Sequence, residues 1–427
     1  MEIHVVQRGE TVYSIAKRYE VPYSQILNDN QLPDPSQLVV GQTLVIRFPL
    51  QIHTVQAGQT LLEIAQQHGT TVRQLQQNNP ILGGGTIIYP GQTLVVSYRQ
   101  RPKDTLSVNG YAYPFIDPPL LQSTLPFLSY LTPFTYGITE QGDLLDLNDE
   151  KLISSATRSG VAPLMHLSTL TEQGGFSNER AALVLNNSDV QNRLIDRVVA
   201  TILQKGYRGL DVDFEFILAR DAGPYAAFIR NLTQTLNPLG IPVIVALAPK
   251  TSATQPGLLY EGHDYGALGA AANQVLLMTY EWGYTYSAPM AVAPLPNVRS
   301  VIEYALTEIP SEKIWLGIPN YGYDWPLPYV NGQTKATSIS NRYAVQLALQ
   351  YNAEIQFDEQ AQTPWFQYTD EQGTTHEVWF EDARSIRAKL ALIPEYGLYG
   401  AGYWNLMRPF PQNWVLLSSL YNIRNGI

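Results

Sequence analysis

A chain of 427 residues is long enough for one large domain and small modules, and with 45% hydrophobic and only 15% charged residues it is globular rather than disordered. A net charge of −10 without any basic run argues against nucleic acid and anionic membrane surfaces as partners, since both are bound by clustered Lys and Arg. The absence of cysteine and the scattered positions of the six histidines exclude disulfides, thiolate nucleophiles and the usual metal-binding spacings, so we expect neither metal nor cofactor.

The N-terminal residues 1–7, Met-Glu-Ile-His-Val-Val-Gln, lack the basic and apolar regions of a signal peptide. No apolar run in the chain reaches the roughly 18 residues that a membrane-spanning helix needs. We therefore expect no membrane insertion and no export by a cleaved signal. A monomer is the favoured oligomeric state.

Two copies of one module occupy residues 2–98. Six residues of the first copy recur 49 positions later: Val6, Gly9, Thr11, Ile15, Ala16 and Asn30 reappear as Val55, Gly58, Thr60, Ile64, Ala65 and Asn79. The run Gly-Gln-Thr-Leu-Val at residues 41–45 recurs at 91–95, so the offset grows by one, and the extra residue falls in the glycine loop 83–85. A repeat at a fixed offset indicates a duplicated structural unit.

Each copy has the pattern strand, helix, helix, strand. In the first copy residues 4–6 predict a short strand, and Thr11 is a favourable N-cap for a helix that carries Ile15 and Tyr19 at helical spacing. A second short helix follows, and residues 43–47 predict the strand that closes the unit.

Both copies resemble the LysM module, which binds glycans containing N-acetylglucosamine, such as peptidoglycan and chitin. The resemblance covers module 1 at residues 2–48 and module 2 at residues 51–98. It implies a binding groove between the first strand–helix turn and the second helix–strand loop. The residues that it places near the glycan are Gly9, Glu10, Thr11 and 37–39 in module 1, and Gly58, Gln59, Thr60 and 87–89 in module 2. The matched apolar residues, such as Ile15 and Ile64, are expected to form the module cores instead.

A short polar linker, residues 99–104, separates the modules from a large domain at residues 105–427. This domain alternates strands and helices, which is typical of a parallel sheet covered by helices. The strands are continuous apolar runs, as expected when both faces are buried. They are predicted at residues 108–113, 130–136, 161–167, 209–216, 243–249, 275–280, 314–321 and 398–405. Eight strands over about 320 residues predict an α/β fold, a (β/α)8 TIM barrel.

One helix and one insertion of the large domain are distinct in the sequence. Residues 190–205 predict a helix whose apolar stripe consists of Val190, Leu194, Val198, Ile202 and Leu203. Residues 324–379 carry β-favouring runs at 353–357 and 365–368, followed by a hairpin turn at 370–373. We expect a small α+β insertion subdomain on the C-terminal rim of the barrel, where it deepens the substrate groove.

Residues 209–215, Gly-Leu-Asp-Val-Asp-Phe-Glu, carry three acidic residues at alternating positions of the fourth strand. Because side chains alternate along a strand, Asp211, Asp213 and Glu215 share one face, and in a barrel that face points inward. Three like charges in an interior are strongly destabilising unless they are protonated, paired or used in function. Glu215 comes last, at the strand end where barrel enzymes carry their catalytic groups.

The fourth strand resembles the signature of family-18 glycosidases, the chitinase and endo-N-acetylglucosaminidase group, which is Asp-Gly-x-Asp-x-Asp-x-Glu. Arg208 replaces the first Asp of that signature, and Phe214 stands where many chitinases have Trp, but the three carboxylates are kept. Met-Thr-Tyr-Glu at residues 278–281, Gly-Ile-Pro-Asn-Tyr-Gly at 317–322 and Tyr-Trp at 403–404 match the family at later strands. The resemblance covers the whole barrel.

The resemblance implies a retaining, substrate-assisted mechanism, in which the 2-acetamido oxygen of the sugar is the nucleophile. In such a site Glu215 protonates the glycosidic oxygen and later acts as base toward water. Asp213 orients the acetamido group, and Asp211 shares a proton or hydrogen bond with Asp213. Tyr280 donates its hydroxyl to the acetamido oxygen, and Trp404 stacks beneath the sugar ring.

Further substrate-binding candidates lie at other strand ends. Glu281 occupies the position of a family acid that bonds substrate hydroxyls, although an exposed acid at a strand end is an ordinary alternative. Tyr111, Asn320 and Tyr321 are candidates for the groove, although aromatic residues at strand ends also pack barrels. His166 is predicted to be a hydrogen-bonded core histidine rather than a catalyst.

Tandem LysM modules before a family-18 barrel resemble the spore cortex-lytic N-acetylglucosaminidases of the SleL/YaaH type, and residues 278–292 and 378–384 do so in particular. This resemblance implies peptidoglycan as the partner, germination as the setting and the spore as the location. Three alternatives stay open: a chitinase or chito-oligosaccharide hydrolase, a catalytically inactive chitinase-like lectin, and a structural coat protein that binds glycan through LysM. A secreted chitinase should carry a signal peptide, a lectin would usually have lost the acid, and a coat protein does not need inward carboxylates.

Overall fold

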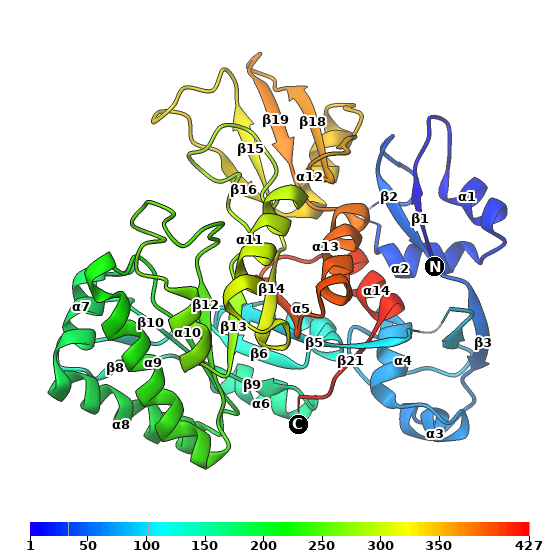
Figure 1. Ribbon diagram of the computed structural model, residues 1–427. Helices are drawn as coiled ribbons and strands as arrows, with labels where there is room; N and C mark the ends of the chain where they lie inside the picture. The colour runs from blue at the N-terminus through cyan, green and yellow to red at the C-terminus, as the bar shows by residue number, and fades with distance from the viewer. Residues whose placement is uncertain (33, 101, 427) are drawn as a thin grey trace.

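The computed structural model describes residues 1–32, 34–100 and 102–426. Two small modules lie beside a barrel, and a subdomain stands on one rim of that barrel (Figure 1). The predicted linker, residues 99–104, includes Arg101, which lies outside the described residues. None of the helices described is both long and apolar enough to cross a membrane.

Each module has the predicted order of strand, helix, helix and strand. Module 1 consists of β1 (Glu2–Val5), α1 (Val12–Tyr19), α2 (Tyr23–Asn30) and β2 (Thr43–Ile46), with β1 and β2 antiparallel. Module 2 consists of β3 (Pro49–Thr54), α3 (Leu61–Gln67), α4 (Val72–Asn78), the 3-10 turn η1 (Pro80–Leu82) and β4 (Thr93–Tyr98). Thr11 is the N-cap of α1, as predicted, and its hydroxyl accepts a hydrogen bond from the amide of Ser14 at 3.1 Å.

The barrel consists of parallel strands in the order β10-β11-β12-β13-β14-β20-β5-β6-β9. Their bounds are β5 (Asp104–Ala112), β6 (Tyr130–Pro133), β9 (Ala162–Pro163), β10 (Met165–Ser168), β11 (Leu210–Asp213), β12 (Val243–Leu247), β13 (Gln274–Leu277), β14 (Ile314–Pro319) and β20 (Gly400–Trp404). β9 and β10 are two pieces of the strand predicted at residues 161–167. The first and last strands in this order are therefore consecutive in the chain, and the barrel closes between them. The predicted TIM-barrel fold is confirmed.

Short strands and helices complete the barrel. The added strands are β21 (Tyr421–Ile423), which pairs with β5, and the hairpin of β7 (Gly137–Ile138) and β8 (Leu144–Leu145). The helices are α5 (Pro118–Thr124), α6 (Glu150–Arg158), α7 (Asn178–Asn186), α8 (Ser188–Lys205), α9 (Ala222–Leu236), α10 (Tyr265–Ala271), α11 (Leu295–Glu308), α13 (Ala383–Tyr396) and α14 (Pro411–Leu420). The 3-10 turns are η2 (Leu125–Phe127), η3 (Ala219–Asp221), η4 (Asn237–Leu239) and η5 (Ser311–Lys313).

The helix predicted at residues 190–205 is α8, and its apolar stripe is correct except at one position. Leu194, Val198 and Ile202 are buried against the barrel, whereas Leu203 is 61% exposed. Successive helical residues are about 100° apart around the axis, so Leu203 faces away when Ile202 faces the core. The assignment of Leu203 to the stripe was therefore wrong.

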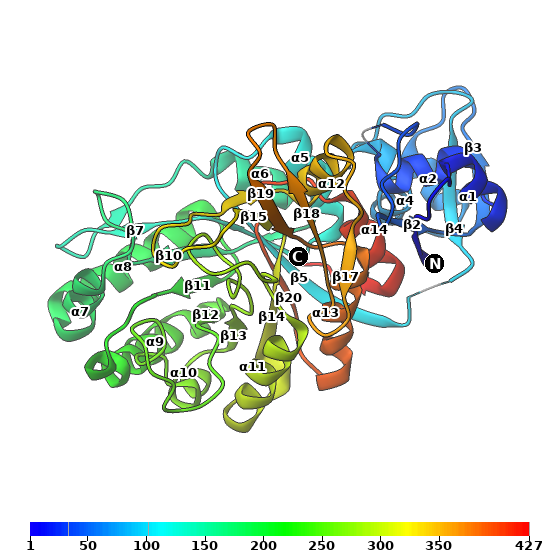
Figure 2. The same cartoon turned by 90° about the horizontal axis from the view of Figure 1, so that it is seen from above.

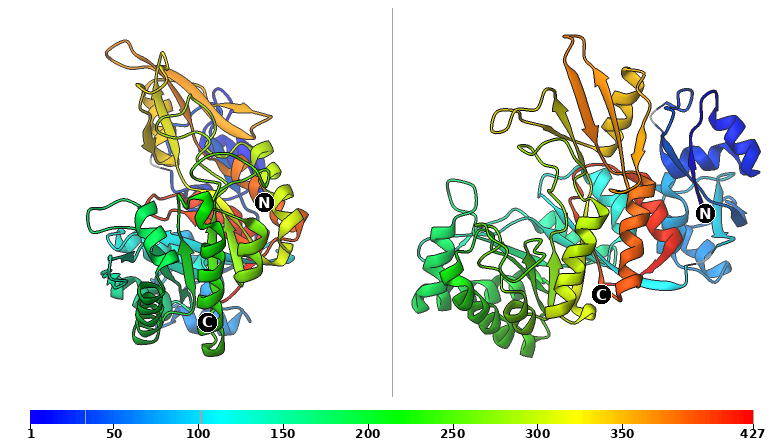
Figure 3. Two further views of the ribbon diagram at one scale, coloured as in Figure 1. Left: turned by 60° about the vertical axis from the view of Figure 1, so that its left-hand side comes forward. Right: turned by 45° about the horizontal axis from the view of Figure 1, so that its top comes forward.

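The insertion subdomain is the predicted α+β unit. It contains β15 (Gly322–Pro326), β16 (Thr337–Ile339), α12 (Asn341–Gln350), β17 (Gln356–Asp358), β18 (Thr363–Thr369) and β19 (Thr375–Trp379). Its antiparallel sheet has the order β16-β15-β19-β18-β17, and the predicted hairpin turn joins β18 to β19. Figure 3 shows this sheet rising from one rim of the barrel, next to module 1.

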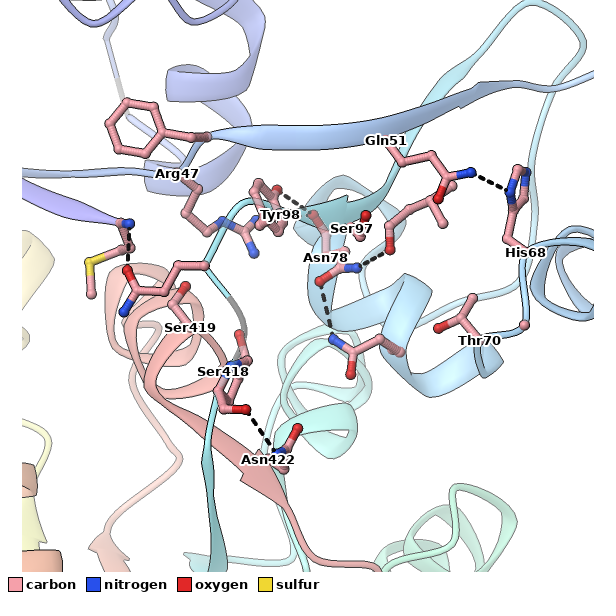
Figure 4. Close-up of a pocket in the computed structure, with 17 residues that line it drawn as sticks. Arg47, Gln51, His68, Thr70, Asn78, Ser97, Tyr98, Ser418, Ser419 and Asn422 are labelled. Atoms are coloured by element: carbon pink, nitrogen blue, oxygen red, sulfur yellow. Dashed lines mark hydrogen bonds between the residues drawn. The ribbon is translucent and has the colours of Figure 1, made fainter.

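The two modules are joined by a buried cation. Arg47 of module 1 donates to the Asp29 carboxylate at 3.0 Å and to the carbonyl of Asn78 in module 2, also at 3.0 Å. Its guanidinium lies 4.1 Å from the ring centroid of Tyr98 (Figure 4). A polar cavity of about 300 Å³ lies beside this junction. Since Asp29 of the same module holds Arg47 in place, the bond from Arg47 to the carbonyl of Asn78 fixes module 2 against module 1.

The modules are also fixed to the barrel, on the side of α14 (Figure 2). Arg73 of α4 donates to the carbonyls of Pro126 at 2.8 Å and Leu128 at 2.5 Å. Gln412, at the start of α14, donates to the carbonyl of Thr43 in β2 at 2.7 Å. These hydrogen bonds involve backbone carbonyls on both sides of the interface, so the modules have a fixed position on the barrel.

Candidate active site

Three acidic residues come from the end of β11. Asp211 and Asp213 lie on the strand, face inward and are buried, as the alternation predicts. Glu215 does not lie on the strand, because β11 ends at Asp213 and the ladder to β12 ends one residue earlier. The backbone of Phe216 then adopts a left-handed conformation (φ +58°), which is rare for an aromatic residue. The predicted strand 209–216 was therefore too long, and Glu215 projects from the loop that follows it.

Asp213 and Glu215 border a cavity of about 490 Å³ at the C-terminal ends of the barrel strands. Six of the predicted site residues line this cavity: Tyr111, Asp213, Glu215, Tyr280, Glu281 and Trp404. Asp211 lies directly beneath, at the bottom of the same strand face. The structure thus brings together side chains from β5, β11, β20 and the loop after β13.

Burial sets the protonation of the acids. Desolvation raises the pKa of Asp211 to about 7, although the Tyr111 hydroxyl, 2.5 Å from Oδ2, opposes the shift by donating a hydrogen bond. Burial, followed by repulsion from Glu215 and Asp211, raises the pKa of Asp213 well above its usual range. Burial, followed by repulsion from Glu281, raises the pKa of Glu215 to about 7. Glu215 is therefore poised to hold a proton near neutral pH.

Asp211 interacts with Asp213 through charge rather than through the expected hydrogen bond. Among the described residues, Asp211 accepts its hydrogen bond from Tyr111, and Oδ1 of each aspartate has no partner. Asp213 lines the cavity, so its carboxyl group can accept a hydrogen bond from a bound molecule.

His166 has a larger part in the site than the sequence indicated. It is buried and hydrogen-bonded, as predicted, with Nδ1 2.6 Å from the Thr135 hydroxyl oxygen. It also lines the cavity, and its Nε2 lies 3.7 Å from Oδ2 of Asp213. Burial lowers the pKa of His166 to about 3, so the ring is neutral at neutral pH. It cannot serve as a cationic partner for Asp213 there.

Trp404 is held in an aromatic corner of the cavity. It is the last residue of β20, and its ring centroid lies 4.8 Å from that of Phe134 and 5.7 Å from that of Tyr111. Asn320, a predicted groove residue, does not line the cavity. Its amide donates to the carbonyls of Asn405 at 2.8 Å and Arg408 at 2.9 Å, which fixes the loop after Trp404.

Glu281 is anchored by Tyr321, which lies between β14 and β15, and by Tyr323 of β15. The hydroxyls of Tyr321 and Tyr323 donate to its carboxylate, the latter at 3.2 Å. Burial raises the pKa of Glu281, although these hydrogen bonds oppose the shift. Tyr321 lies behind Glu281 rather than at the cavity wall, so it contacts the site through that carboxylate.

Several lining residues had no signal in the sequence. Phe134, Phe176, Phe216, Tyr260 and Tyr284 all line the cavity. Most of them lie in loops, where no periodicity identifies an aromatic residue as facing a site. Among the described residues, no three His, Asp or Glu side chains converge as a possible metal site.

A family model confirms the resemblance of the barrel to the family-18 glycosidases. The model described as glycosyl hydrolases family 18 matches residues 154–408, which is more than half of the chain. The chain belongs to glycosyl hydrolase family 18. It is therefore a glycoside hydrolase, and the catalytic domain is called the family-18 barrel below. The LysM domain model matches residues 4–47 and 53–97.

Relatives of the whole chain are known. The chain is 42% identical to the cortical fragment-lytic enzyme of Bacillus subtilis (strain 168) over 99% of both chains. It is 36% identical to the putative sporulation-specific glycosylase YdhD of the same organism, over 99% of this chain and all of the relative. The crystal structure of the Bacillus megaterium QM B1551 spore cortex-lytic enzyme SleL matches 100% of this chain and 99% of that one, with a TM-score of 0.83 and 38% identity.

In the LysM modules, the side chains expected to bind glycan are mostly engaged within the turns. Glu10 Oε2 lies 2.7 Å from His4 Nε2 and accepts the amide of Gln7 at 2.8 Å. Gln59 accepts the amide of Gln56 in the same way, also at 2.8 Å. Thr11 and Thr60 cap their helices. Gly9 and Gly58 have positive φ and exposed backbone, so these six residues shape the turns.

Proposed function

We propose that the protein is a retaining N-acetylglucosaminidase that cleaves spore cortex peptidoglycan or its fragments after N-acetylglucosamine, during germination. The observation that carries the proposal is one cavity in which Glu215, Asp213, Tyr280 and Trp404 surround the same space. The names of the relatives support the polymer, since they are cortical fragment-lytic and spore cortex-lytic enzymes. A location in the spore is part of the same proposal.

The first step breaks the glycosidic bond. Glu215, protonated near neutral pH, gives its proton to the glycosidic oxygen as the bond from C1 breaks and its electron pair passes to that oxygen. The acetamido oxygen of the same sugar attacks C1 and forms an oxazolinium ring.

Asp213 positions the acetamido group. Its carboxyl group, which lines the cavity, accepts a hydrogen bond from the acetamido N–H, which directs the carbonyl oxygen toward C1. The hydrogen bond from the acetamido N–H to the Asp213 carboxyl oxygen stabilises the positive charge that develops on the oxazolinium ring. Tyr280 lines the cavity and donates its hydroxyl to the acetamido oxygen. Trp404 supplies a flat apolar surface for the sugar ring.

The second step opens the intermediate. Glu215, now a carboxylate, takes a proton from water as the water oxygen attacks C1 and the acetamido group is restored. Two inversions at C1 give net retention. Among the described lining residues there is no Lys or Arg, which suits a neutral N-acetylated sugar better than an anionic one.

The direct test is digestion of purified cortex fragments and, in parallel, of N-acetylglucosamine oligomers, with identification of each new reducing end. The proposal requires N-acetylglucosamine at the reducing ends of the cortex products. Activity on chitin oligomers alone would overturn the assignment to cortex and favour a chitinase. A protein that binds both polymers but cleaves neither would be a lectin.

The acid is tested by Glu215→Gln, which keeps the shape but cannot donate the proton. We expect kcat to fall by about 10³-fold, within the range for removal of a general acid. Glu312→Gln is the matched control, because Glu312 is exposed at the opposite end of the barrel, before β14. Normal activity in Glu215→Gln contradicts the mechanism.

A further inference from the structure

Modules 1 and 2 bring their two predicted glycan-binding loops together in the same way. In module 1 the amide of Gly41 donates to the carbonyl of Val6 at 2.9 Å, and in module 2 the amide of Gly91 donates to the carbonyl of Val55 at 2.8 Å. Each bond ties the loop before the closing strand to the turn after the first strand. The two loops are therefore neighbouring walls of the predicted glycan-binding groove in both modules. What surrounds these walls differs between module 1 and module 2.

In module 1 both walls contact the insertion subdomain, which lies beside it in Figures 1 and 3. The amide of Ile355 donates to the carbonyl of Val40 at 2.9 Å, which engages the loop before β2. The neighbouring Glu354 forms an ion pair with Arg8, in the turn after β1. Two consecutive residues of the subdomain thus bridge both walls of the module 1 groove.

The bridge is packed as well as hydrogen-bonded. Val39 is only 5% exposed and belongs to the apolar core of the subdomain, together with Ile355 and Phe366. A Cβ on Gly41 would collide with the carbonyl oxygen of Ile355. Since backbone meets backbone here, a sugar ring that approaches this wall has to displace the subdomain.

The same positions of module 2 are open. Tyr89, which corresponds to Val39, is 67% exposed, and Ile87, which corresponds to Gln37, is 75% exposed. A Cβ on Gly91 would meet no atom within 4 Å. In the part of the chain that the structure describes, no hydrogen bond or ion pair joins residues 86–92 to the barrel or the subdomain. An exposed tyrosine beside an exposed isoleucine is a surface on which sugar rings stack.

We propose that module 2 alone binds an N-acetylglucosamine glycan, whereas module 1 is a bracket that holds the insertion subdomain against the barrel. This inference rests on the proposed function, because it takes such a glycan to be the modules' ligand. With one open groove per chain, the tandem arrangement gives no avidity. Retention of the enzyme on an insoluble glycan then depends on Tyr89 and its neighbours.

The test uses the full chain in a Glu215→Gln/Trp404→Ala background, which prevents cleavage and weakens sugar binding in the barrel. Retention on insoluble peptidoglycan is measured by sedimentation over a range of protein concentrations. The module 2 variant is Ile87→Ser/Tyr89→Ala, and the matched module 1 variant is Gln37→Ala, at the exposed position that corresponds to Ile87. Unchanged thermal unfolding of both variants serves as the control for folding.

We expect the apparent affinity to fall at least tenfold in the module 2 variant and less than twofold in the module 1 variant. An equal loss in both, a larger loss in Gln37→Ala, or no loss in either would overturn the inference. Hydrolysis of soluble fragments is measured separately, with the two module substitutions in an otherwise unchanged enzyme, and should stay within twofold of normal. An enzyme without N-acetylglucosaminidase activity would refute the proposed function, while the retention result would still decide the role of each module.

Discussion

At the scale of single residues, burial and hydrogen-bond partners separate the acidic residues of the site into different roles. Asp211 is enclosed and bonded by Tyr111, Asp213 lines the cavity from the end of β11, and Glu215 lies in the loop at the cavity wall. Glu281 is held by its tyrosines and adds negative charge near Glu215. The same residue type therefore serves as a proton donor in one place and as a fixed charge in another.

Burial and the charge of Glu281 together influence the pH range of activity. A neighbouring negative charge disfavours a carboxylate, so the charge of Glu281 adds to burial in raising the pKa of Glu215. Since Glu215 must start protonated, kcat/KM should fall as the pH rises through about 7. Glu281→Gln should lower the pKa of Glu215 and move this alkaline limb to lower pH. An alkaline limb that does not move in the pH profile of a soluble N-acetylglucosamine oligomer would refute this coupling.

Asp211 should lower stability as the pH rises. Its pKa is about 7 in the folded chain against an ordinary 3.8, so the native state binds more protons than the unfolded state between about pH 4 and 7. The free energy of unfolding should therefore decrease over that window, by up to about 4 kcal/mol from this group. Asp211→Asn removes the effect and should raise the Tm at pH 8, but not at pH 4, while it lowers activity. An equal change in Tm at both pH values would contradict this linkage.

The sequence predicts the residue types of the site better than their partners. Alternation along one strand was sufficient to place Asp211 and Asp213 on the inner face. It did not indicate that Tyr111 bonds Asp211, since the two residues are 100 positions apart. The place of His166, on β10, in the cavity wall and the position of Asn320 behind Trp404 likewise depend on tertiary packing, which residue type and spacing do not encode.

At the scale of elements, apolar runs and caps fix most strands and helices, but not where β11 ends. Phe214, Glu215 and Phe216 continue the pattern of a strand, yet the chain leaves the sheet after Asp213. The turn depends on the left-handed backbone of Phe216, for which its side chain gives no signal. The splitting of the third strand at Leu164 is of the same kind.

The duplicated glycines provide a matched test of the contact between module 1 and the subdomain. Gly41 and Gly91 have φ of +86° and +83°, so an alanine is strained by about 1–2 kcal/mol at either position. Only at Gly41 does the added Cβ also meet the backbone of Ile355. Gly41→Ala should therefore lower the Tm clearly more than Gly91→Ala. Equal shifts in a thermal unfolding measurement would show that the contact with Ile355 does not form.

At the scale of the whole molecule, the modules and the family-18 barrel form one assembly. The sequence predicted two modules, a short linker and a barrel as separate units. The contacts that fix them join residues far apart in the chain, such as Thr43 with Gln412, and have no local pattern. Docking of the modules therefore could not be predicted from periodicity or composition.

Arg73 should be a main anchor of this assembly. Its substitution by Ala leaves the carbonyl of Leu128 without its donor and leaves Pro126 with the amide of Gln77 alone, and we expect a loss of about 2 kcal/mol in the free energy of unfolding. Arg8→Ala breaks only the exposed ion pair with Glu354, which should contribute less than about 1 kcal/mol. Urea unfolding of the two variants compares them directly, and a smaller effect at Arg73 than at Arg8 would refute this ranking.

The central claim is that the substrate's acetamido oxygen, rather than water, first attacks C1. The anomeric form of the first product tests it most directly, by proton NMR at early times of hydrolysis of an N-acetylglucosamine oligomer, before mutarotation. The account predicts that the new reducing-end N-acetylglucosamine appears as the β-anomer, which is the configuration of the bond that was cut. Initial formation of the α-anomer would show inversion by direct attack of water and would contradict the account.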